Sequence, residues 1–486
     1  MSSVISRYLS PIYLLACLTC GGASAAGYLA NGVLQLLALG IIVFLVLTNA
    51  VPALSASARQ LLLIVAAVAG LLVLQLIPLP AGIWSLLPGR QEAAQGYALV
   101  GISPPWLPLS LAPERTVEVL ISILPPLAMV LLTFSSSGYG RLYSIYVALA
   151  FALVSILFGV FQHIQGPDSP YYIYDITNRG GVVAFFANRN HLSTFLLSTL
   201  PFLAALAITP SRKTDSDKKL GRRMISGCML MFVAVGVIVV KSVAGWMLLA
   251  PVLIACLLIF QRGEQGKLSI GFVQATVVAT ILATGLALFA PIQLNDLGDK
   301  LSGVGPHERN ESISTTARAS LDYLPFGSGA GSFRYIYPQY EKAADASSEY
   351  VNHAHDDYVE VLLENGLPGI TLLGWFVAWW LLTFRSVWRN NSAPGSFGRA
   401  AFVTVGVILA HSVVDYPVRT AAVAAIGGMA AALLVAPEPV EAPASQFRRR
   451  KRRDANRSIM IGADMDKPRP NPIDKDPASR AAGLDI

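Results

Sequence analysis

Charged residues are scarce in this sequence, and that scarcity decides the class of protein. Asp, Glu, Lys and Arg make up 13% of the 486 residues, whereas 54% of the residues are hydrophobic. The mean hydropathy of +0.56 exceeds what a soluble globular domain needs to bury its core. The composition therefore excludes a soluble globular protein and predicts a polytopic membrane protein.

Cysteine is also rare. Cys17, Cys20, Cys228 and Cys256 lie inside apolar runs and lack the spacing of a disulfide framework or a zinc site. We expect them to be small packing residues. No cage of acidic residues for a metal ion is evident in the sequence, so we expect neither a metal nor a cofactor.

The net charge of +7 arises largely from two basic runs, at 212–223 and 448–457. Lys and Arg next to apolar segments mark the cytoplasmic side of a membrane protein. Both runs therefore indicate orientation rather than a nucleic-acid-binding surface, and no nucleic acid is expected as a partner.

Long apolar runs supply the transmembrane segments, because a helix needs about 20 apolar residues to cross a bilayer. We predict an all-α membrane domain over residues 1–436 with about 12 transmembrane helices, followed by a disordered basic tail over 437–486. The predicted spans are 11–30, 32–50, 60–80, 117–134, 141–163, 191–209, 224–240, 244–260, 268–290, 367–384, 400–415 and 418–436.

Twelve spans place both basic runs, and both termini, on the cytoplasmic side. The connection 291–366 then faces outward, and its five basic against twelve acidic residues suit an exported loop. This loop is long enough to carry function. We expect it to be partly helical and to pack on the periplasmic face of the membrane domain, while the tail contacts anionic lipid.

The densest group of ionisable residues lies in 352–369, which reads NHAHDDYVEVLLENGLPG. The helical period puts the carboxylates on one side of an amphipathic helix, which Gly366 and Pro368 are expected to stop before an apolar span. Ionisable groups where a chain enters a membrane indicate a functional site, although a solvated interfacial helix would show the same pattern. The residues concerned are His353, His355, Asp356, Asp357, Glu360 and Glu364.

The same loop holds two arginines and a glycine-rich turn. Arg309 and Arg318 are suited to bind phosphate oxygens bidentately, or else they pair with nearby carboxylates. Gly327, Gly329 and Gly331 alternate in PFGSGAGSF. Such glycines allow close backbone approach and exposed N–H groups for an anion, although the pattern alone equally fits a turn.

Two further groups of polar residues precede predicted spans. Asn188, Arg189, Asn190 and His191 stand at the start of a membrane helix, whose positive end favours anions; an interfacial anchor is the alternative. Lys241 lies in a tight external turn. There it either adds positive charge to an anion-binding pocket shared with residues 188–191, or its side chain reaches the membrane surface.

Together these segments resemble the O-antigen ligase and Wzy-type polysaccharide polymerase superfamily. FFANRNHLSTFLLSTLP, RNESISTTARASLDYLPFGSGAGSF and HAHDDYVEVLLENGLPG each resemble a segment of that family, and so does WLPLSLAP at 106–113. The similarity extends over roughly residues 100–440. Three residues depart from the family pattern: Asp356 replaces Asn, Ile313 replaces Trp, and Val243 replaces Arg. The replacement of Arg by Val243 removes a second positive charge that the family uses to bind the diphosphate of its lipid-linked substrate. Lys241 or Arg189 is the candidate substitute for that charge.

The resemblance implies a bacterial inner-membrane glycosyltransferase of the GT-C-like type, active at the periplasmic face. Such enzymes take a glycan from undecaprenyl diphosphate and join it to lipid A core or to another glycan, in lipopolysaccharide or exopolysaccharide biosynthesis, and other polysaccharide-export components are candidate partners. By position, His355 matches the histidine that deprotonates the acceptor, with His353 beside it, and Arg309 matches the arginine that binds the diphosphate.

Elementary chemistry agrees with this mechanism. Glycan transfer needs a base near neutral pH, which histidine supplies, and fixed positive charge on the leaving diphosphate, which arginine supplies. Asp356, Asp357 or Glu364 is expected to orient the imidazole. We expect His355 to lie near Arg309 and within reach of the 185–191 segment.

The rival function is a transporter or flippase for a lipid-linked glycan or a small anion. A transporter keeps ionisable residues near the bilayer centre, whereas here they concentrate in one exported loop. The absence of a visible internal repeat also disfavours a transporter built from inverted repeats. The sequence therefore favours an enzyme, and it does not separate a ligase from a polymerase.

Overall fold

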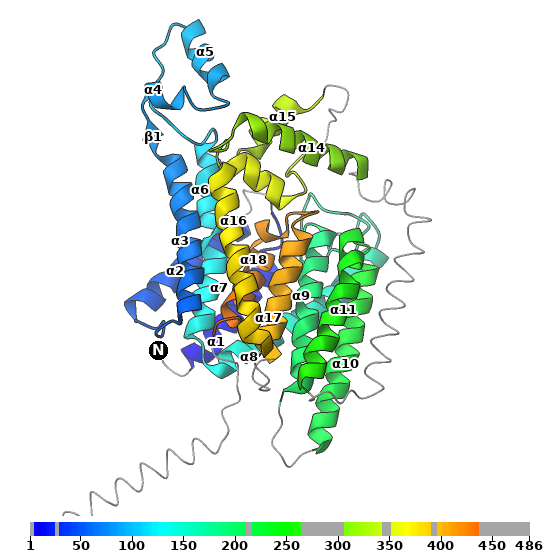
Figure 1. Ribbon diagram of the computed structural model, residues 1–486. Helices are drawn as coiled ribbons and strands as arrows, with labels where there is room; N and C mark the ends of the chain where they lie inside the picture. The colour runs from blue at the N-terminus through cyan, green and yellow to red at the C-terminus, as the bar shows by residue number, and fades with distance from the viewer. Residues whose placement is uncertain are drawn as a thin grey trace, which may run out of the picture. The chain divides into compact units, whose positions relative to one another are not determined.

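The computed structural model describes residues 4–24, 29–209, 216–263, 306–342, 351–389 and 396–436, all within one compact unit, Met1–Val440 (Figure 1). The predicted span 268–290 and the predicted tail 437–486 lie outside the described residues. So does the side chain of Arg309, whose backbone belongs to a helix.

The described chain is mostly helical, with one two-stranded pairing. The helices are α1 (Ile5–Cys20), α2 (Leu29–Leu47), α3 (Ala56–Leu76), α4 (Ala81–Trp84), α5 (Gln91–Leu99), α6 (Pro113–Ser122), α7 (Leu124–Ser135), α8 (Gly138–Ile164), α9 (Arg189–Ile208), α10 (Ser216–Val239), α11 (Val243–Gly263), α14 (Pro306–Asp322), α15 (Phe333–Tyr340), α16 (Asp357–Arg389), α17 (Ser396–His411), the 3-10 turn η2 (Pro417–Arg419) and α18 (Ala421–Leu433). Strand β1 (Pro78–Leu79) pairs antiparallel with β2 (Leu107–Pro108).

Hydropathy located these helices well but misjudged some lengths. Within the described residues, eight helices are long and apolar enough to cross a membrane, the pair α6–α7 counting as one. Three further predicted spans correspond to the shorter apolar helices α1, α17 and α18. The predicted span 11–30 is displaced, because α1 ends at Cys20 with Gly21 as its C-cap.

Helix α9 lies at the centre of one group of helices. It packs against α8, α10, α11, α17 and α18, and every residue from Asn190 to Ile208 is buried. Hydroxyls such as those of Thr194 and Ser198 donate to helix carbonyls one turn earlier, whereas Ser193 Oγ and both ring nitrogens of His191 have no hydrogen-bond partner among the described residues. A helix that is buried on all sides holds its first turn, including His191, in a fixed position.

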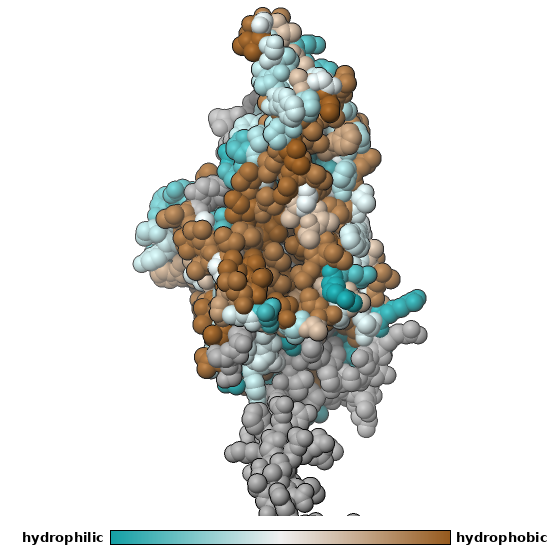
Figure 2. All heavy atoms as spheres, turned by 90° about the vertical axis from the view of Figure 1, so that its left-hand side faces the viewer, coloured by the Kyte–Doolittle hydropathy of each residue, from teal (hydrophilic) through white to brown (hydrophobic). Residues whose placement is uncertain are grey.

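A second group comprises α1, α2, α7 and α18, and α3 packs against α6 and α16 beside it. The outer faces of α2 and α3 are apolar, with exposed residues such as Leu36, Leu47, Leu63 and Leu74. Figure 2 shows apolar side chains gathered over this side of the molecule. Such a surface suits the lipid interior of a membrane.

The described part of the long loop lies at one end of these helices, where α14 and α15 cross near the first turns of α16 (Figure 1). Gly366 interrupts the helical path of α16 with φ 57° and ψ −151°, as the sequence predicted. Gly366 therefore divides Asp357–Arg389 into two helices that meet at a kink, the first carrying the acidic residues and the second the apolar span. The side of the membrane that this end faces stays a prediction.

Candidate functional site

The start of α16 presents three buried carboxylates on one face. Asp357, Glu360 and Glu364 are three and four residues apart, a spacing that aligns side chains along a helix. Asp356 has another role, because its Oδ1 accepts hydrogen bonds from the amides of Tyr358 and Val359. It caps the helix, and Asn and Asp are equally good caps. This accounts for an aspartate at a position where the resembled family has asparagine.

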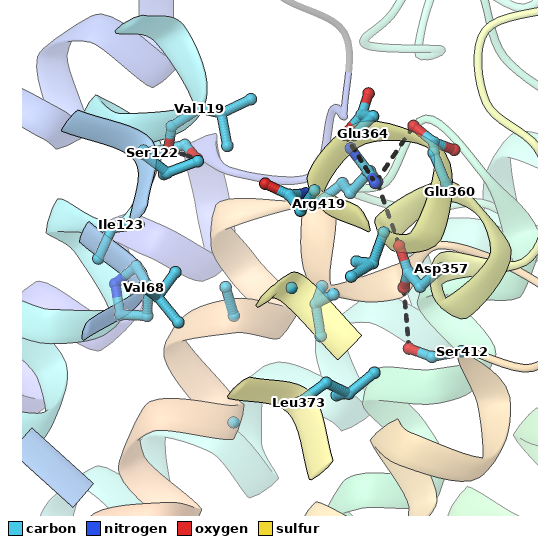
Figure 3. A pocket seen from close by; sticks show the side chains of 18 of the residues that line it. Val68, Val119, Ser122, Ile123, Asp357, Glu360, Glu364, Leu373, Ser412 and Arg419 are labelled. Atoms are coloured by element: carbon cyan, nitrogen blue, oxygen red, sulfur yellow. Dashed lines mark hydrogen bonds and ion pairs between the residues drawn. The ribbon is translucent and has the colours of Figure 1, made fainter. Parts of the chain in front are cut away.

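Arg419 reaches this carboxylate face from η2, between α17 and α18. Its Nε donates to Asp357 Oδ1 at 3.1 Å, and its Nη2 lies 3.2 Å from Glu360 Oε1 and 3.8 Å from Glu364 Oε2 (Figure 3). Burial alone would lower the pKa of Arg419, but the three carboxylates outweigh burial and raise that pKa. Arg419 therefore stays charged and holds three acidic residues together.

His353 is attached to the same cluster. Its Nδ1 lies 2.9 Å from Glu360 Oε1, while the amide of Ala354 donates to Glu360 Oε2. Its Nε2 has no hydrogen-bond partner among the described residues. Burial lowers the pKa of His353, an effect that Glu360 only partly offsets. The imidazole is therefore neutral at pH 7, with one nitrogen fixed and the other available.

His355 faces a different carboxylate. Its backbone is left-handed, with φ 59°, and its Nδ1 lies 3.8 Å from Asp415 Oδ1. His191, at the start of α9, places Nε2 at 3.9 Å from the same oxygen. These distances allow charge pairing but exceed a direct hydrogen bond. Burial would raise the pKa of Asp415, but the neighbouring imidazoles outweigh burial and hold that pKa below its usual range.

The meeting of His191 and His355 at Asp415 confirms the expectation that the 185–191 segment lies within reach of the histidine segment. The ring of Tyr416 joins the two clusters, with centroids 4.4 Å from His353 and 5.2 Å from both His355 and His191. His411 completes this layer through a 2.8 Å contact between its Nδ1 and Thr194 Oγ1.

A cavity of about 830 Å³ opens beside the carboxylate cluster. Figure 3 shows Arg419, Glu360 and Glu364 at one end of it and apolar side chains such as Val68 and Leu373 farther along. Helices α2, α3, α6, α7, α15, α16, α17 and α18 contribute to its walls. The polar residues of its lining include Arg115, Glu118, Arg334, Asn352, His353, Asp357, Glu360, Glu364, Ser412 and Arg419.

The glycine-rich turn packs against the kink of α16. Gly327, Gly329 and Gly331 have φ of 82°, 105° and 79°, conformations that favour glycine. The amides of Gly327 and Gly329 donate to Tyr323 O and Glu364 O, so these N–H groups are engaged within the protein. A Cβ on Gly329 would lie 2.5 Å from the Cα of Ser110. The glycines thus allow two backbones to approach closely.

Gln75 connects the glycine-rich turn to two helices by hydrogen bonds. Gln75, at the end of α3, accepts from the amide of Ala330 at 2.9 Å through its Oε1. Its Nε2 donates to Glu364 O and to Asn365 Oδ1 at 3.2 and 3.3 Å. The side chain is buried, and the three bonds tie α3, the turn and α16 together.

The predicted site residues at the start of α9, in the turn before α11 and in α14 do not belong to the described lining of the cavity. Asn188 caps α9 by accepting from the amide of Asn190 at 2.8 Å, and the amide of Arg189 donates to Asn178. Arg318 is exposed and donates to Thr315 Oγ1. Lys241 is exposed in the turn before α11, with φ 58°. Substrate binding by these residues stays a prediction.

Sequence reasoning missed most of the partners. Glu360 was recognised in the acidic helix but was given no role in the site. Asp415 and Arg419 were placed at the ends of the predicted spans 400–415 and 418–436, with Tyr416 between them. A signal was present, because His411, Asp415 and Arg419 follow one another at helical spacing inside apolar sequence. Ionisable residues in such a context mark functional sites.

A comparison with protein families identifies one related family. Residues 227–374 match the family model of the O-antigen ligase. The match confirms the resemblance to the O-antigen ligase and Wzy-type polymerase superfamily, and with it a multi-pass membrane protein of polysaccharide biosynthesis. The matched segment includes the first turns of α16. A search of curated proteins returned no match.

Within the part of the chain that the structure describes, no group of three or more His, Cys, Asp or Glu side chains is arranged to hold a metal ion. That the reaction needs no metal stays a prediction.

Proposed function

We propose that this protein is a glycosyltransferase that moves a glycan from undecaprenyl diphosphate to a glycan or lipid A core acceptor at the periplasmic face of the inner membrane. The observation that carries this proposal is a single cavity with apolar walls and a strongly polar end. A lipid-linked diphosphate has the same two parts. The O-antigen ligase match supports the same class of reaction.

The apolar part of the cavity is suited to the isoprenoid chain, and the polar end to the diphosphate and the sugars. Arg115 from α6 and Arg334 from α15 line that end in addition to Arg419. Guanidinium groups stabilise the charge that develops on the leaving diphosphate. Binding of the diphosphate by Arg309 and Arg318 remains part of this proposal.

Proton removal from the acceptor hydroxyl requires a base close to that diphosphate. His353 and His355 are the candidates, and each has a carboxylate partner, Glu360 and Asp415 respectively. A carboxylate fixes the tautomer of an imidazole and stabilises the imidazolium that forms.

The alternative, a transporter or flippase, is less well supported. The cluster around Arg419 lies at the first turn of α16 and in the turn after α17, which are helix ends rather than helix centres. A transport site is expected near the bilayer midplane.

A transfer assay tests the proposed function. Purified protein in nanodiscs should release undecaprenyl diphosphate from an undecaprenyl-diphosphate oligosaccharide and extend the acceptor. Labelled glycan on lipid A core would identify a ligase, and longer lipid-linked glycan a polymerase. Movement of the lipid-linked glycan between leaflets without any new glycosidic bond would contradict the proposal and indicate a flippase.

Replacing Arg115 by Gln should raise the KM for the lipid-linked donor about 10- to 100-fold, because a charged hydrogen bond to phosphate contributes about 1.5–3 kcal/mol. Steady-state kinetics with varied donor measures this change. Glu114→Gln is a matched control, since Glu114 is the exposed neighbour on the same helix, outside the described cavity lining. An Arg115→Gln protein with unchanged KM would exclude Arg115 from donor binding.

A further inference from the structure

Three buried carboxylates share one guanidinium at the polar end of the cavity, and they share it unequally. Arg419 lies 3.1 Å from Asp357 Oδ1 and 3.2 Å from Glu360 Oε1. Its Nη2 is 3.8 Å from Glu364 Oε2, which is beyond the range of a hydrogen bond. All three carboxylates line the cavity (Figure 3). Glu364 is therefore the carboxylate whose charge Arg419 compensates least.

The surroundings of Glu364 favour its neutral form. The residue is buried, with 2% of its surface exposed, on the acidic part of α16 that precedes the apolar span. Burial raises the pKa of Glu364 to about 7, and Arg419 only partly opposes this effect. Glu360 raises that pKa further, whereas the backbone amides of Gly331 and Phe333 lower it. The charge of Glu364 therefore changes close to neutral pH.

The described lining of the cavity carries more negative than positive side chains. Three arginines face four carboxylates, and burial lowers the pKa of His353, so that its imidazole is neutral at pH 7. The charged members are Arg115 and Glu118 on α6, Arg334 on α15, Arg419 at η2, and Asp357, Glu360 and Glu364 on α16. A bound diphosphate would add negative charge at this end, and like charges favour protonation of a carboxylate.

Other charged and titratable groups on the elements packed against α16 contact partners of their own. Helix α3 contributes the neutral side chain of Gln75 here, and Arg59 is exposed at the other end of that helix. The remaining contacts are Glu311 with Lys342, Arg318 with Thr315 and Asp322 with Tyr340 at α14, and Arg399 with Val387 O and His411 with Thr194 at α17.

We propose that Glu364 takes up one proton from solvent when the donor diphosphate enters the cavity, and releases it when the lipid diphosphate leaves. This inference rests on the proposed glycosyltransferase function. The proton binds Oε2, because Oε1 accepts from the amide of Phe333 at 3.3 Å. A single O–H bond forms and later breaks. A protonated carboxyl group is a hydrogen-bond donor, so it can bind a phosphate oxygen that a carboxylate would repel.

Donor affinity should therefore depend on pH. Bound diphosphate raises the pKa of Glu364 above its value in the empty cavity, so affinity is greatest below pH 7 and declines as the pH rises above 7. The Kd should increase about 3- to 10-fold for each pH unit above about pH 7.5, and tenfold corresponds to the uptake of one whole proton.

Calorimetric titration of the full-length protein in nanodiscs measures both the affinity and the proton. The probe is a farnesyl diphosphate ester of N-acetylglucosamine. Both of its phosphates are esterified, so it lacks the second ionisation near about pH 6 of a terminal phosphate, and only the protein titrates. Titrations at about pH 8 in buffers of different ionisation enthalpy should show uptake of about 0.5–1 proton per bound donor.

Three variants assign the proton to one residue. Glu364→Gln keeps an acceptor for the Phe333 amide but cannot titrate, so its Kd should be independent of pH and about 3- to 10-fold below the wild-type Kd at about pH 8. Glu118→Gln is the matched control, because it removes a negative charge from an exposed side chain of the same lining. It should lower Kd equally at every pH. Asp357→Asn should keep the pH dependence, although burial also raises the pKa of Asp357.

A wild-type Kd that is independent of pH, without proton uptake, would overturn the inference and leave donor binding, and with it the proposed function, intact. A pH dependence that persists in Glu364→Gln and disappears in Asp357→Asn would assign the proton to Asp357 and overturn the role of Glu364. Absence of donor binding at every pH would contradict the proposed function itself, and the inference with it.

Discussion

Arg419→Leu is expected to be destabilised by about 3–5 kcal/mol, because it leaves three buried carboxylates without their cation. Asp357 would keep only the hydroxyl of Ser412 at 2.9 Å, and Glu360 only His353 and the amide of Ala354. Thermal unfolding of the purified protein in detergent measures the loss. The destabilisation should shrink at lower pH, where protonation of the carboxylates removes their mutual repulsion.

Two companion variants test the electrostatic cause. Adding Asp357→Asn and Glu364→Gln to Arg419→Leu should recover part of the lost stability, since the uncompensated charges are gone. Arg419→Lys should be intermediate, because an ammonium keeps the charge but cannot reach several carboxylates with a planar fork. Arg419→Leu with wild-type thermal stability would show that the cluster contributes nothing to the fold.

Gly366→Ala is expected to separate the glycine-rich turn from α16. Gly366 has φ 57° and ψ −151°, a conformation essentially restricted to glycine. A Cβ there would lie 2.2 Å from Pro325 O and 2.7 Å from Gly327 N, which are backbone atoms that no side-chain rotation can move. We expect a loss of about 3 kcal/mol or more, together with loss of transfer activity.

Gly374 provides the matched control on the same helix. A Cβ at Gly374 would meet no described atom within 4 Å, so Gly374→Ala should leave the unfolding temperature unchanged or raise it. Both variants are compared by thermal unfolding in detergent and by protease cleavage within 325–332. Equal unfolding temperatures and equal protection of the turn would contradict the close packing at Gly366.

The elements that hydropathy predicts are those whose signal is local. The helices α2, α3, α7, α8, α9, α10 and α11 follow directly from apolar runs, because the bilayer requires a continuous apolar helix. The first helix was misplaced since apolar character continues past Cys20, whereas its end depends on close packing: a Cβ on Gly22 would lie 1.9 Å from Phe185 O. That contact joins segments that are distant in the sequence, so the residues around Gly22 do not predict it.

The site was predictable in composition but not in pairing. The histidines and carboxylates of 353–364 stand out because ionisable residues are rare in this chain. Their principal partner, Arg419, does not stand out in the sequence. It lies 62 residues beyond Asp357 and follows a proline at the end of an apolar run. His355 has a left-handed backbone conformation, which decides which of the two histidines borders the cavity. A histidine in the sequence does not predict that conformation.

The bonds of Gln75 have a consequence for biogenesis. The ribosome delivers this side chain to the membrane 255 residues before Ala330 and 289 residues before Glu364. Until those residues emerge, the side-chain amide of Gln75 lacks these hydrogen-bond partners, and the cavity lacks the part of its wall that α16 supplies. The polar end therefore closes late in synthesis, once the chain has passed Asn365. A product that ends before Ala330 has none of the three hydrogen bonds that hold α3, the glycine-rich turn and α16 together.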